Sequence, residues 1–260
     1  MKITVVKIGG NVIDDATALR GFLRSFAALP HHQILVHGGG KIATEIGYKL
    51  GIEPNYINGR RITDEATRDL VTMVYAGAIN KNIVQLLQAA QCNAFGLTGA
   101  DGGVIPAALR PVKEVDYGYV GDVVTDKIKV ALLRALLQLG LTPVFAPLTF
   151  NKESGILNTN ADTIARELAI ALSAVAETDL VYCFEKDGVL SDPSDAASVI
   201  PIVTAPIFDT LKKENIVGGG MIPKLENALS AVAAGVKKVT IGSSLHLQEL
   251  IDGKKGTTIL

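Results

Sequence analysis

The chain has 260 residues, a formal net charge of −1 and a hydrophobic content of 48%. This length allows a substantial core, in one large domain or two lobes. The near-neutral charge offers no basic surface for nucleic acid or for an anionic membrane, so we expect neither partner. The first apolar run, in MKITVVKIGG, is too short for a signal peptide or a membrane span, and we expect a cytoplasmic protein.

Two cysteines, Cys92 and Cys183, lie in apolar stretches that have neither CxxC spacing nor a clustered histidine. Metal and redox motifs need such spacing, and disulfide frameworks belong to oxidising compartments. We therefore expect no protein-held metal site and a reducing environment.

Short β-rich apolar runs alternate with long helical patterns along most of the chain. The predicted strands are 3–8, 33–37, 93–98, 142–147, 178–184 and 237–241. The predicted helices are 14–28, 40–50, 64–90, 126–139, 160–175 and 221–234. Apolar strands separated by helices form βαβ units, so the predicted fold class is α/β: a three-layer αβα sandwich with a mainly parallel central sheet.

Two segments interrupt this alternation, 103–125 and 149–158, where turn residues separate β-prone stretches. They predict added β-hairpins, which commonly form lids or pocket walls, and 103–125 is our candidate lid. No linker marks a domain boundary. We place a soft division near 175, with an N-lobe (1–175) and a C-lobe (176–260) that share one sheet.

Glycine clusters accompany two lysines near opposite ends of the chain, Lys7 in VVKIGGN and Lys224 in VGGGMIPK. Between them lies another cluster, VHGGGK, at residues 36–41, which is the second of the three in chain order. Glycines that free backbone N–H groups beside fixed cations suit a polyphosphate. Two such sites far apart in the sequence predict one phosphate chain held from both sides, as in a small-molecule kinase.

The second cluster also fits G-x-G-x-x-A, with Gly38, Gly40 and Ala43, a pattern of dinucleotide-binding folds. Those folds need an acidic residue about twenty positions later, where this chain has Arg60 and Arg61. No glycine cluster runs into Gly-Lys-Ser/Thr, so a Walker A loop is absent. A dinucleotide-dependent dehydrogenase is therefore a distant alternative.

The run NTNAD (158–162) introduces the predicted helix 160–175. Capping of the helix and compensation of its dipole would by themselves explain the presence of Asn160 and Asp162 at these positions. Asp162 can in addition hold two lysines by charge-assisted hydrogen bonds, which would leave Asn158 free to bind a substrate.

Taken together, these segments resemble the amino-acid kinase family over essentially the whole chain. The matching motifs are KIGGN (7–11), VHGGG (36–40), NGRRIT (58–63), AGAINK (76–81), GLTGADGG (96–103), YVGDV (119–123), NTNAD (158–162), DGVL (187–190) and GGMIPK (219–224). The combination of NGRRIT, AGAINK, GLTGADGG and NTNAD resembles the branch that phosphorylates the side-chain carboxylate of an N-acylated glutamate in arginine biosynthesis. The implied reaction converts N-acetyl-L-glutamate and ATP to N-acetyl-L-glutamyl 5-phosphate.

The resemblance implies a role for each matching residue. Lys7 and Lys224 neutralise the phosphoryl group in flight, and Asp162 orients them. The implied phosphate-binding residues are Gly9, Gly10, Gly39 and Gly40; the implied substrate-binding residues are Gly39, Gly40, Arg61 and Asn158; the implied nucleotide-binding residues are Asp187, Gly219, Gly220 and Met221. The implied cofactor is Mg²⁺ with ATP, held mainly by the ATP phosphates.

The chemistry of the acceptor fits the shortage of general bases in the sequence. A glutamate side chain has a pKa of about 4.3 and is already an ionised nucleophile at neutral pH. What remains is to align two anions and to screen their repulsion. We expect His37 to be structural, packed under the glycine turn.

Three features depart from the family pattern. FEKDGV (184–189) stands where TDVDGV is usual, so the role of Glu185 is open and Asp187 is our assignment. Arg60 replaces an apolar residue; it is either a solvated arginine or a partner for a second carboxylate, which would make N-succinyl-L-glutamate the substrate. No helix precedes the first strand, and the resemblance then implies an arginine-insensitive homodimer joined through the helix 64–90.

Two rival functions remain open. Another specificity within the family, N-acetylaminoadipate kinase or glutamate 5-kinase, would share the phosphate-binding residues. A non-catalytic regulator that binds a nucleotide or an amino acid is the alternative of a different class. The presence of Lys7, Asp162 and Lys224 together favours an enzyme.

Overall fold

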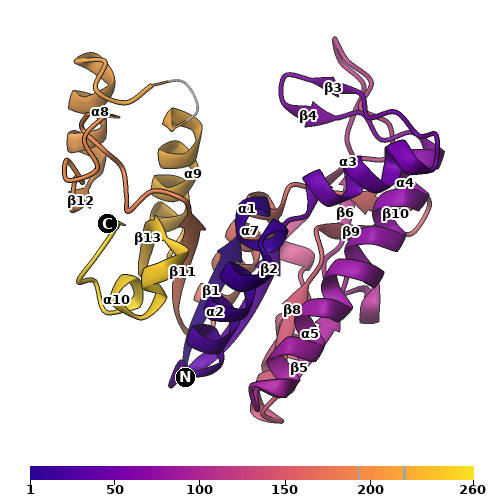
Figure 1. Ribbon diagram of the computed structural model, residues 1–260, viewed down its shortest axis with the longest axis horizontal. Coiled ribbons are helices and arrows are strands. Elements are labelled where there is room, and N and C mark those ends of the chain that lie inside the picture. The colour runs from indigo at the N-terminus through magenta and orange to yellow at the C-terminus, as the bar shows by residue number, and fades with distance from the viewer. Residues whose placement is uncertain (193, 219–220) are drawn as a thin grey trace.

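The computed structural model describes residues 1–192, 194–218 and 221–260. Its centre is an eight-stranded sheet with the strand order β12-β14-β13-β11-β1-β2-β8-β5 (Figure 1). The strands of this sheet are β1 (Lys2–Ile8), β2 (His32–His37), β5 (Ala94–Leu97), β8 (Thr142–Phe145), β11 (Glu177–Phe184), β12 (Ile202–Val203), β13 (Lys238–Ser243) and β14 (Thr257–Ile259).

Every neighbouring pair in this sheet is parallel except β13 and β14. The central strand β1 is buried from its second residue onward, which is why its sequence reads as an almost continuous apolar run. The predicted α/β class with a mainly parallel sheet is confirmed. The short strands β12 and β14 at one edge were not predicted.

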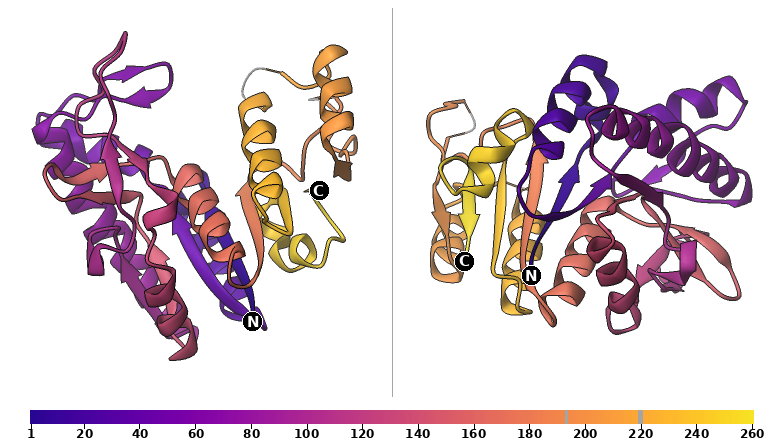
Figure 2. Two further views of the ribbon diagram at one scale, coloured as in Figure 1. Left: turned by 180° about the vertical axis from the view of Figure 1, so that it is seen from behind. Right: turned by 90° about the horizontal axis from the view of Figure 1, so that it is seen from below.

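Helices cover both faces of the sheet, as the three-layer prediction requires (Figures 1 and 2). One face carries α1 (Gly10–Asp14), α2 (Ala16–Ala27), α3 (Gly40–Lys49), α4 (Glu65–Val71), α5 (Asn80–Ala89) and α10 (Leu247–Ile251). The other carries α6 (Val130–Gln138), α7 (Ala161–Ser173), α8 (Ala205–Lys213) and α9 (Ile222–Ala233). On α2 the buried residues are Leu19, Phe22, Leu23 and Phe26, a helical spacing that turns one apolar stripe toward the sheet.

The predicted helix 14–28 corresponds to α2, and the short α1 that precedes it was not predicted. Helix α1 starts at the first glycine turn, and Asp15 then caps α2 by accepting hydrogen bonds from the backbone N–H groups of Thr17 and Ala18. The short helices α8 and α10 were not predicted, because neither gives a long periodic pattern.

The predicted helix 64–90 is continuous but not uniformly α-helical. It comprises α4, a π-helical segment (Thr72–Ile79, η1) and α5. By length and composition Glu65–Ala89 is also apolar enough to cross a membrane. One of its faces is nevertheless buried against the sheet through Leu70, Val74 and Ile83, as expected for a core helix, and length and composition alone are weak evidence for a span.

Both predicted hairpins are present: β6 (Ala107–Leu109) pairs with β7 (Gly121–Val123), and β9 (Leu148–Asn151) pairs with β10 (Gly155–Asn158). A third hairpin, β3 (Tyr56–Ile57) with β4 (Arg60–Arg61), was missed. Its turn residues Asn58 and Gly59 both have positive φ, as Asn-Gly turns of hairpins do. This hairpin projects beyond the carboxyl ends of the central strands (Figure 1).

Candidate active site

Lys7 lies near the carboxyl end of β1, in the centre of the sheet. Its Nζ is 2.7 Å from Oδ1 of Asp162, and the Lys7 side chain is only 10% exposed. Because β1 is flanked by β2 and β11, the carboxyl ends of three parallel strands meet beside this pair. Ligands of open α/β sheets bind at such an edge.

Asp162 is in the first turn of α7, where a carboxylate also complements the helix dipole. Asn160 is the N-cap, and its side chain accepts hydrogen bonds from the backbone N–H groups of Asp162 and Thr163. The hydroxyl of Tyr182 in β11 donates to the carbonyl oxygen of Asp162 at 3.1 Å. The start of α7 is therefore fixed from both sides, and the Asp162 carboxylate faces Lys7.

Lys224 reaches the same place from the first turn of α9. Its Nζ lies 3.9 Å from the ring centroid of Phe184, the last residue of β11. Burial lowers the pKa of Lys224, opposed by the charge of Asp162 and reinforced by that of Lys7. The three predicted catalytic residues, which are far apart in the sequence, are thus brought together.

Hydrogen bonds also connect α7 to α9 within one turn of these residues. Arg166, one turn after Asp162, donates from Nη1 to Oδ1 of Asn227 in α9 at 2.6 Å and also pairs with the Glu167 carboxylate. The other oxygen of Glu167 accepts from the hydroxyl of Thr125, at the end of the segment predicted as a lid. The helices that contain Asp162 and Lys224 are therefore joined by a hydrogen bond.

The first two glycine clusters lie side by side at this edge of the sheet. The backbone N–H of Gly38 donates to the carbonyl oxygen of Ile8, and a Cβ atom on Gly38 would lie 3.7 Å from the backbone nitrogen of Gly10. Gly39 has φ +146°, and a Cβ there would lie 2.3 Å from the Ile79 side chain, so only glycine fits. A Cβ on Gly9 would lie 3.7 Å from Lys7 Nζ, which brings this cluster next to the lysine pair.

Arg61, predicted to bind the substrate, is buried at the base of the β3–β4 hairpin. Its Nη2 donates to the carbonyl oxygen of Gly40 at 2.9 Å and to the hydroxyl of Thr44 at 2.7 Å, and its guanidinium stacks on the Tyr56 ring. Asn158, at the end of β10, donates from Nδ2 to the hydroxyl of Thr63 at 3.0 Å. Arg61 therefore lies beside the second glycine cluster, and Asn158 lies beside the residues that follow the hairpin.

Arg60 lies on the opposite side of the hairpin from Arg61. Tyr56 pairs with Arg61 and Ile57 with Arg60, and adjacent strand residues point to opposite faces. Arg60 is exposed, and within residues 1–192, 194–218 and 221–260 no hydrogen-bond or ion-pair partner contacts it.

Two of the four predicted nucleotide-binding residues, Asp187 and Met221, lie within the residues that the structure describes. Asp187 follows β11, and its Oδ1 is 3.9 Å from Nε2 of His246. Asp187 and Glu185 line a hollow of about 230 Å³ together with Leu190 and Ser194. Met221 precedes α9, whereas Gly219 and Gly220 lie outside the residues that the structure describes.

His37 is completely buried under the second glycine cluster, where we expected a structural role. Its Nδ1 lies 2.7 Å from the carbonyl oxygen of Gly38 and must carry the proton, so Nε2 accepts from Nδ2 of Asn80. Burial lowers the pKa of His37 to about 4, so the ring is neutral at neutral pH. Asn80 and Phe184 lie within motifs that we had noted, but neither was predicted individually.

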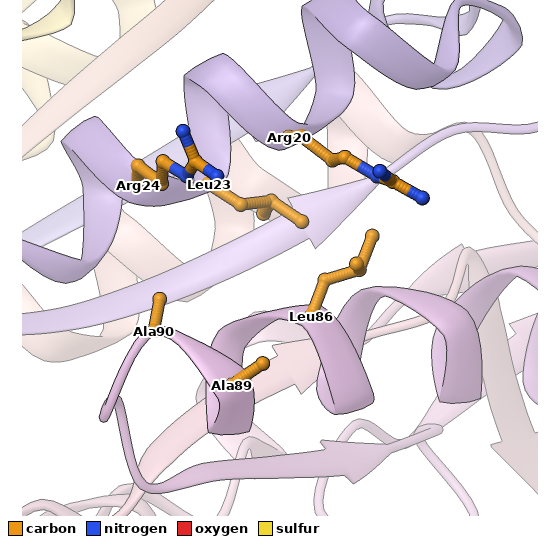
Figure 3. Close-up of a pocket in the computed structure, with 6 residues that line it drawn as sticks. All are labelled: Arg20, Leu23, Arg24, Leu86, Ala89 and Ala90. Carbon is orange, nitrogen blue, oxygen red and sulfur yellow. The ribbon is translucent and has the colours of Figure 1, made fainter.

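Another hollow lies away from the lysines, between α2 and α5 (Figure 3). It is lined by Arg20, Leu23, Arg24, Leu86, Ala89 and Ala90. Its volume, about 250 Å³, is below the range of roughly 300–1,000 Å³ that is usual for ligand pockets. Neither arginine is buried, so we assign no site to this surface groove.

The sequence profile of the amino acid kinase family matches residues 2–243. The chain belongs to the amino acid kinase family. An acetylglutamate kinase of Bacteroides thetaiotaomicron is 52% identical to this amino acid kinase over 258 residues, and the match covers 99% of this chain and 98% of that protein.

Solved structures resemble this amino acid kinase over nearly its full length. The protein smu.665 of Streptococcus mutans has a TM-score of 0.78 at 29% identity and covers 99% of this chain and 98% of its own. N-acetylglutamate synthase of Neisseria gonorrhoeae, complexed with coenzyme A and N-acetyl-glutamate, has a TM-score of 0.82 at 22% identity. That match covers 99% of this chain but 59% of the synthase, and its low identity indicates a shared fold alone.

Proposed function

We propose that this amino acid kinase works in the cytoplasm, where it transfers the γ-phosphoryl group of ATP to the side-chain carboxylate of N-acetyl-L-glutamate in arginine biosynthesis. The observation that carries the proposal is the convergence of Lys7, Asp162 and Lys224 beside two glycine clusters. The 52% identity to an acetylglutamate kinase over nearly the whole chain supports the choice of acceptor.

The reaction needs no general base. One oxygen of the ionised acceptor carboxylate attacks the γ-phosphorus, and the new O–P bond forms there. The bond from phosphorus to the oxygen that bridges the β- and γ-phosphates breaks, and that oxygen leaves with ADP. The product is N-acetyl-L-glutamyl 5-phosphate.

The roles of the site residues follow from the charges that must be brought together. Two anions meet in this reaction, so catalysis consists mainly of alignment and charge screening. Lys7 and Lys224 neutralise the transferred group, and Asp162, which pairs with Lys7 and whose charge also acts on Lys224, orients them. The backbone N–H groups proposed to cradle that group belong to Gly9, Gly10, Gly39 and Gly40.

Arg61 and Asn158 are our candidates for recognition of the acceptor's α-carboxylate. Nη2 of Arg61 donates to Gly40 and Thr44, and the Arg61 side chain also interacts with the Tyr75 hydroxyl, so the guanidinium is held in one orientation. A planar guanidinium fixed in this way is well suited to bidentate binding of a carboxylate.

Mg²⁺ enters the reaction as part of the MgATP substrate. Among the described residues, no group of three or more His, Cys, Asp or Glu side chains is arranged to hold a metal ion. We propose that the ATP phosphates hold most of this ion, because Mg²⁺ in kinase sites is bound largely by substrate phosphates and water. We assign the nucleotide to residues 176–260, with Asp187, Gly219, Gly220 and Met221 on its side of the site, and the acceptor to residues 1–175.

N-Succinyl-L-glutamate is the second candidate acceptor, favoured by the unpartnered, exposed guanidinium of Arg60. Its position on the face opposite Arg61 is the reason that we rank it second. If Arg60 binds a succinyl carboxylate, Arg60→Leu lowers kcat/KM for N-succinyl-L-glutamate by about 10-fold or more and spares N-acetyl-L-glutamate. An unchanged preference between the two substrates would eliminate this role.

We also propose that the protein is a homodimer joined through the long helix 64–90. Met73 in this helix is 59% exposed, and Phe95 on β5, the outermost strand on that side of the sheet, is 44% exposed. Large apolar side chains at an unpaired sheet edge favour a partner surface. Light scattering should give twice the chain mass, and Met73→Glu should shift the protein toward the monomer.

Acyl-phosphate trapping with hydroxylamine tests the proposed function. The protein is incubated with ATP, Mg²⁺ and either N-acetyl- or N-succinyl-L-glutamate, with unacylated glutamate as the substrate control. We expect hydroxamate from one acylated substrate, at a rate that Lys224→Ala lowers by about 10²- to 10³-fold. Lys213→Ala, which removes an exposed lysine of α8, is the matched control and should keep full activity.

Each failure points to a different alternative. No hydroxamate from either substrate would shift the proposal to N-acetylaminoadipate or glutamate as acceptor, and both are tested in the same way. Nucleotide binding without turnover of any of these acceptors would indicate a non-catalytic regulator.

A further inference from the structure

The ring of Phe184 contacts both lysines of the candidate site. Its centroid lies 3.9 Å from Lys224 Nζ and 5.5 Å from Lys7 Nζ. Both distances are within the roughly 6 Å at which an ammonium group is attracted to the negative face of an aromatic ring. One side chain at the end of β11 therefore touches two cations that come from opposite ends of the chain.

Lys224 depends on this ring more than Lys7 does. Lys7 has the Asp162 carboxylate at 2.7 Å, whereas in the described part of the chain no carboxylate lies within ion-pair distance of Lys224 Nζ. The charged groups that act on Lys224 are Asp162, Lys7 and Glu185, and its burial disfavours the charged form. The aromatic face is thus the nearest group that stabilises the Lys224 ammonium.

The ring is itself held in place. Tyr182, two residues earlier in β11, stacks on Phe184 with a centroid distance of 6.2 Å and an interplanar angle of 29°. The same Tyr182 donates its hydroxyl hydrogen bond to the carbonyl oxygen of Asp162. Tyr182 therefore contacts both the ring that lies against the lysines and the backbone of the residue that pairs with Lys7.

We propose that Phe184 is a positioning residue for phosphoryl transfer. Its ring face holds the Lys7 and Lys224 ammonium groups close together, next to the place where the phosphoryl group is transferred. This inference rests on the proposed function. A ring face attracts cations without adding a formal negative charge. A further carboxylate at this position would also hold the lysines, but it would repel the phosphates of ATP and the acceptor carboxylate.

Steady-state kinetics of Phe184 variants test the proposal. Phe184→Leu keeps an apolar side chain but removes the ring, and we expect kcat to fall by about 10-fold. Phe184→Tyr keeps the ring face and should stay within about 3-fold of the wild type. Phe208→Leu is the matched control, because Phe208 also lies under a lysine, Lys212 at 5.8 Å, but on α8, and it should leave kcat unchanged.

The pH profile and nucleotide binding separate positioning from other roles of the ring. Loss of the ring removes a contact that favours the charged form of Lys224, so the alkaline limb of kcat should move to lower pH in Phe184→Leu. The Kd of ADP should stay within about 2-fold of the wild-type value, because a residue that positions the lysines for the transferred group contributes little to the binding of ADP. A raised Kd with an unchanged kcat would make Phe184 a nucleotide contact and overturn the proposal, as would equal activity of the Leu and Tyr variants.

An NMR measurement on the free enzyme does not depend on the acceptor. The ε-methylene protons of Lys224 should show an upfield ring-current shift that Phe184→Leu abolishes and Phe208→Leu preserves. Absence of that shift in the wild type would overturn the proposal. If the wild type phosphorylates no acylglutamate while the shift is present, the proposed acceptor fails and the arrangement of ring and lysines stands.

Discussion

The two ends of strand β1 each carry a lysine that faces an aspartate, and their surroundings differ. At the amino end, Lys2 Nζ lies 3.2 Å from Oδ2 of Asp179. At the carboxyl end, Lys7 Nζ lies 2.7 Å from Oδ1 of Asp162. Asp179 is the more deeply buried carboxylate, with 2% of its side chain exposed against 30% for Asp162. Burial of an ion pair therefore does not distinguish a site from a structural contact.

Ion pairing and open backbone groups do distinguish the two ends. At the amino end, Lys2 also faces Glu177, and Lys237 pairs with Glu177 at 2.7 Å, so both lysines have a carboxylate partner. At the carboxyl end, Lys224 has no carboxylate within ion-pair distance among the described residues, although the charges of Asp162 and Glu185 act on it. Two glycine clusters adjoin it. A cation without an ion-pair partner beside glycine turns suits an anionic ligand.

The largest expected effect separates the two lysines of β1. Lys7→Met should lower kcat by about 10²- to 10³-fold, because it removes a charge that stabilises the transferred group. Lys2→Met should leave kcat per folded molecule unchanged and lower the free energy of unfolding. Initial rates of hydroxamate formation and urea denaturation of both variants measure this difference, and equal losses of activity would end the distinction between the two ends.

A second expected effect concerns pH and the carboxyl end of β2. The pKa of His37 is about 4 in the folded protein and about 6.5 when exposed, so the unfolded chain binds the proton first as the pH falls. The free energy of unfolding should therefore drop by about 3 kcal/mol between pH 6.5 and pH 4. Urea titrations across this range test it, and His37→Gln should flatten the dependence, whereas His31→Gln, at an exposed position, should not.

A smaller effect is expected from the buried carboxylate of the amino end. Asp179→Ala should lower the free energy of unfolding by about 2 kcal/mol, less than the roughly 3–5 kcal/mol of a fully buried pair, because the Lys2 side chain is 31% exposed. The kcat of the folded fraction should not change. A loss of activity without a loss of stability would show that this end of the sheet contributes to the site.

The smallest effect is expected for the ion pair of Lys237 and Glu177, at the amino end of β1. Lys237 and Glu177 are both largely exposed, and exposed ion pairs contribute little to stability. Lys237→Ala should leave the urea midpoint nearly unchanged at moderate salt. A clear shift would indicate that Lys2, Lys237 and the two carboxylates act as one network.

Much of the fold was predictable because buried parallel strands give continuous apolar runs. The strand at residues 3–8 and the helix start at Asn160 were found from such local patterns. The meeting of Lys7, Asp162 and Lys224 followed from a family resemblance, since no local pattern reports contacts across the chain. The β3–β4 hairpin was missed although its Asn58-Gly59 turn is a recognisable signal.

Other features have no signal in the local sequence. A phenylalanine at the end of a strand usually indicates core packing, so the contacts of Phe184 with two lysines depend on where α9 brings Lys224. The partner of Asp179 likewise depends on the pairing of β1 with β11. The π-helical segment Thr72–Ile79 lies against Gly39 through Tyr75 and Ile79, a contact that its own sequence does not report.

That π-helical segment sets the phase between the two halves of the long helix. Before it, Asp64 caps α4 next to the hairpin; after it, Asn80 donates hydrogen bonds to the carbonyl oxygen of Val144 and to His37. A π-helical ring contains one residue more than an α-helical ring. Deleting one residue from Thr72–Ile79 and restoring α-helical bonding would change the rotation between the two halves, because each residue turns an α-helix further than it turns a π-helix. The long helix is therefore a poor place for length variation, and insertions or deletions should be tolerated in the exposed loops instead.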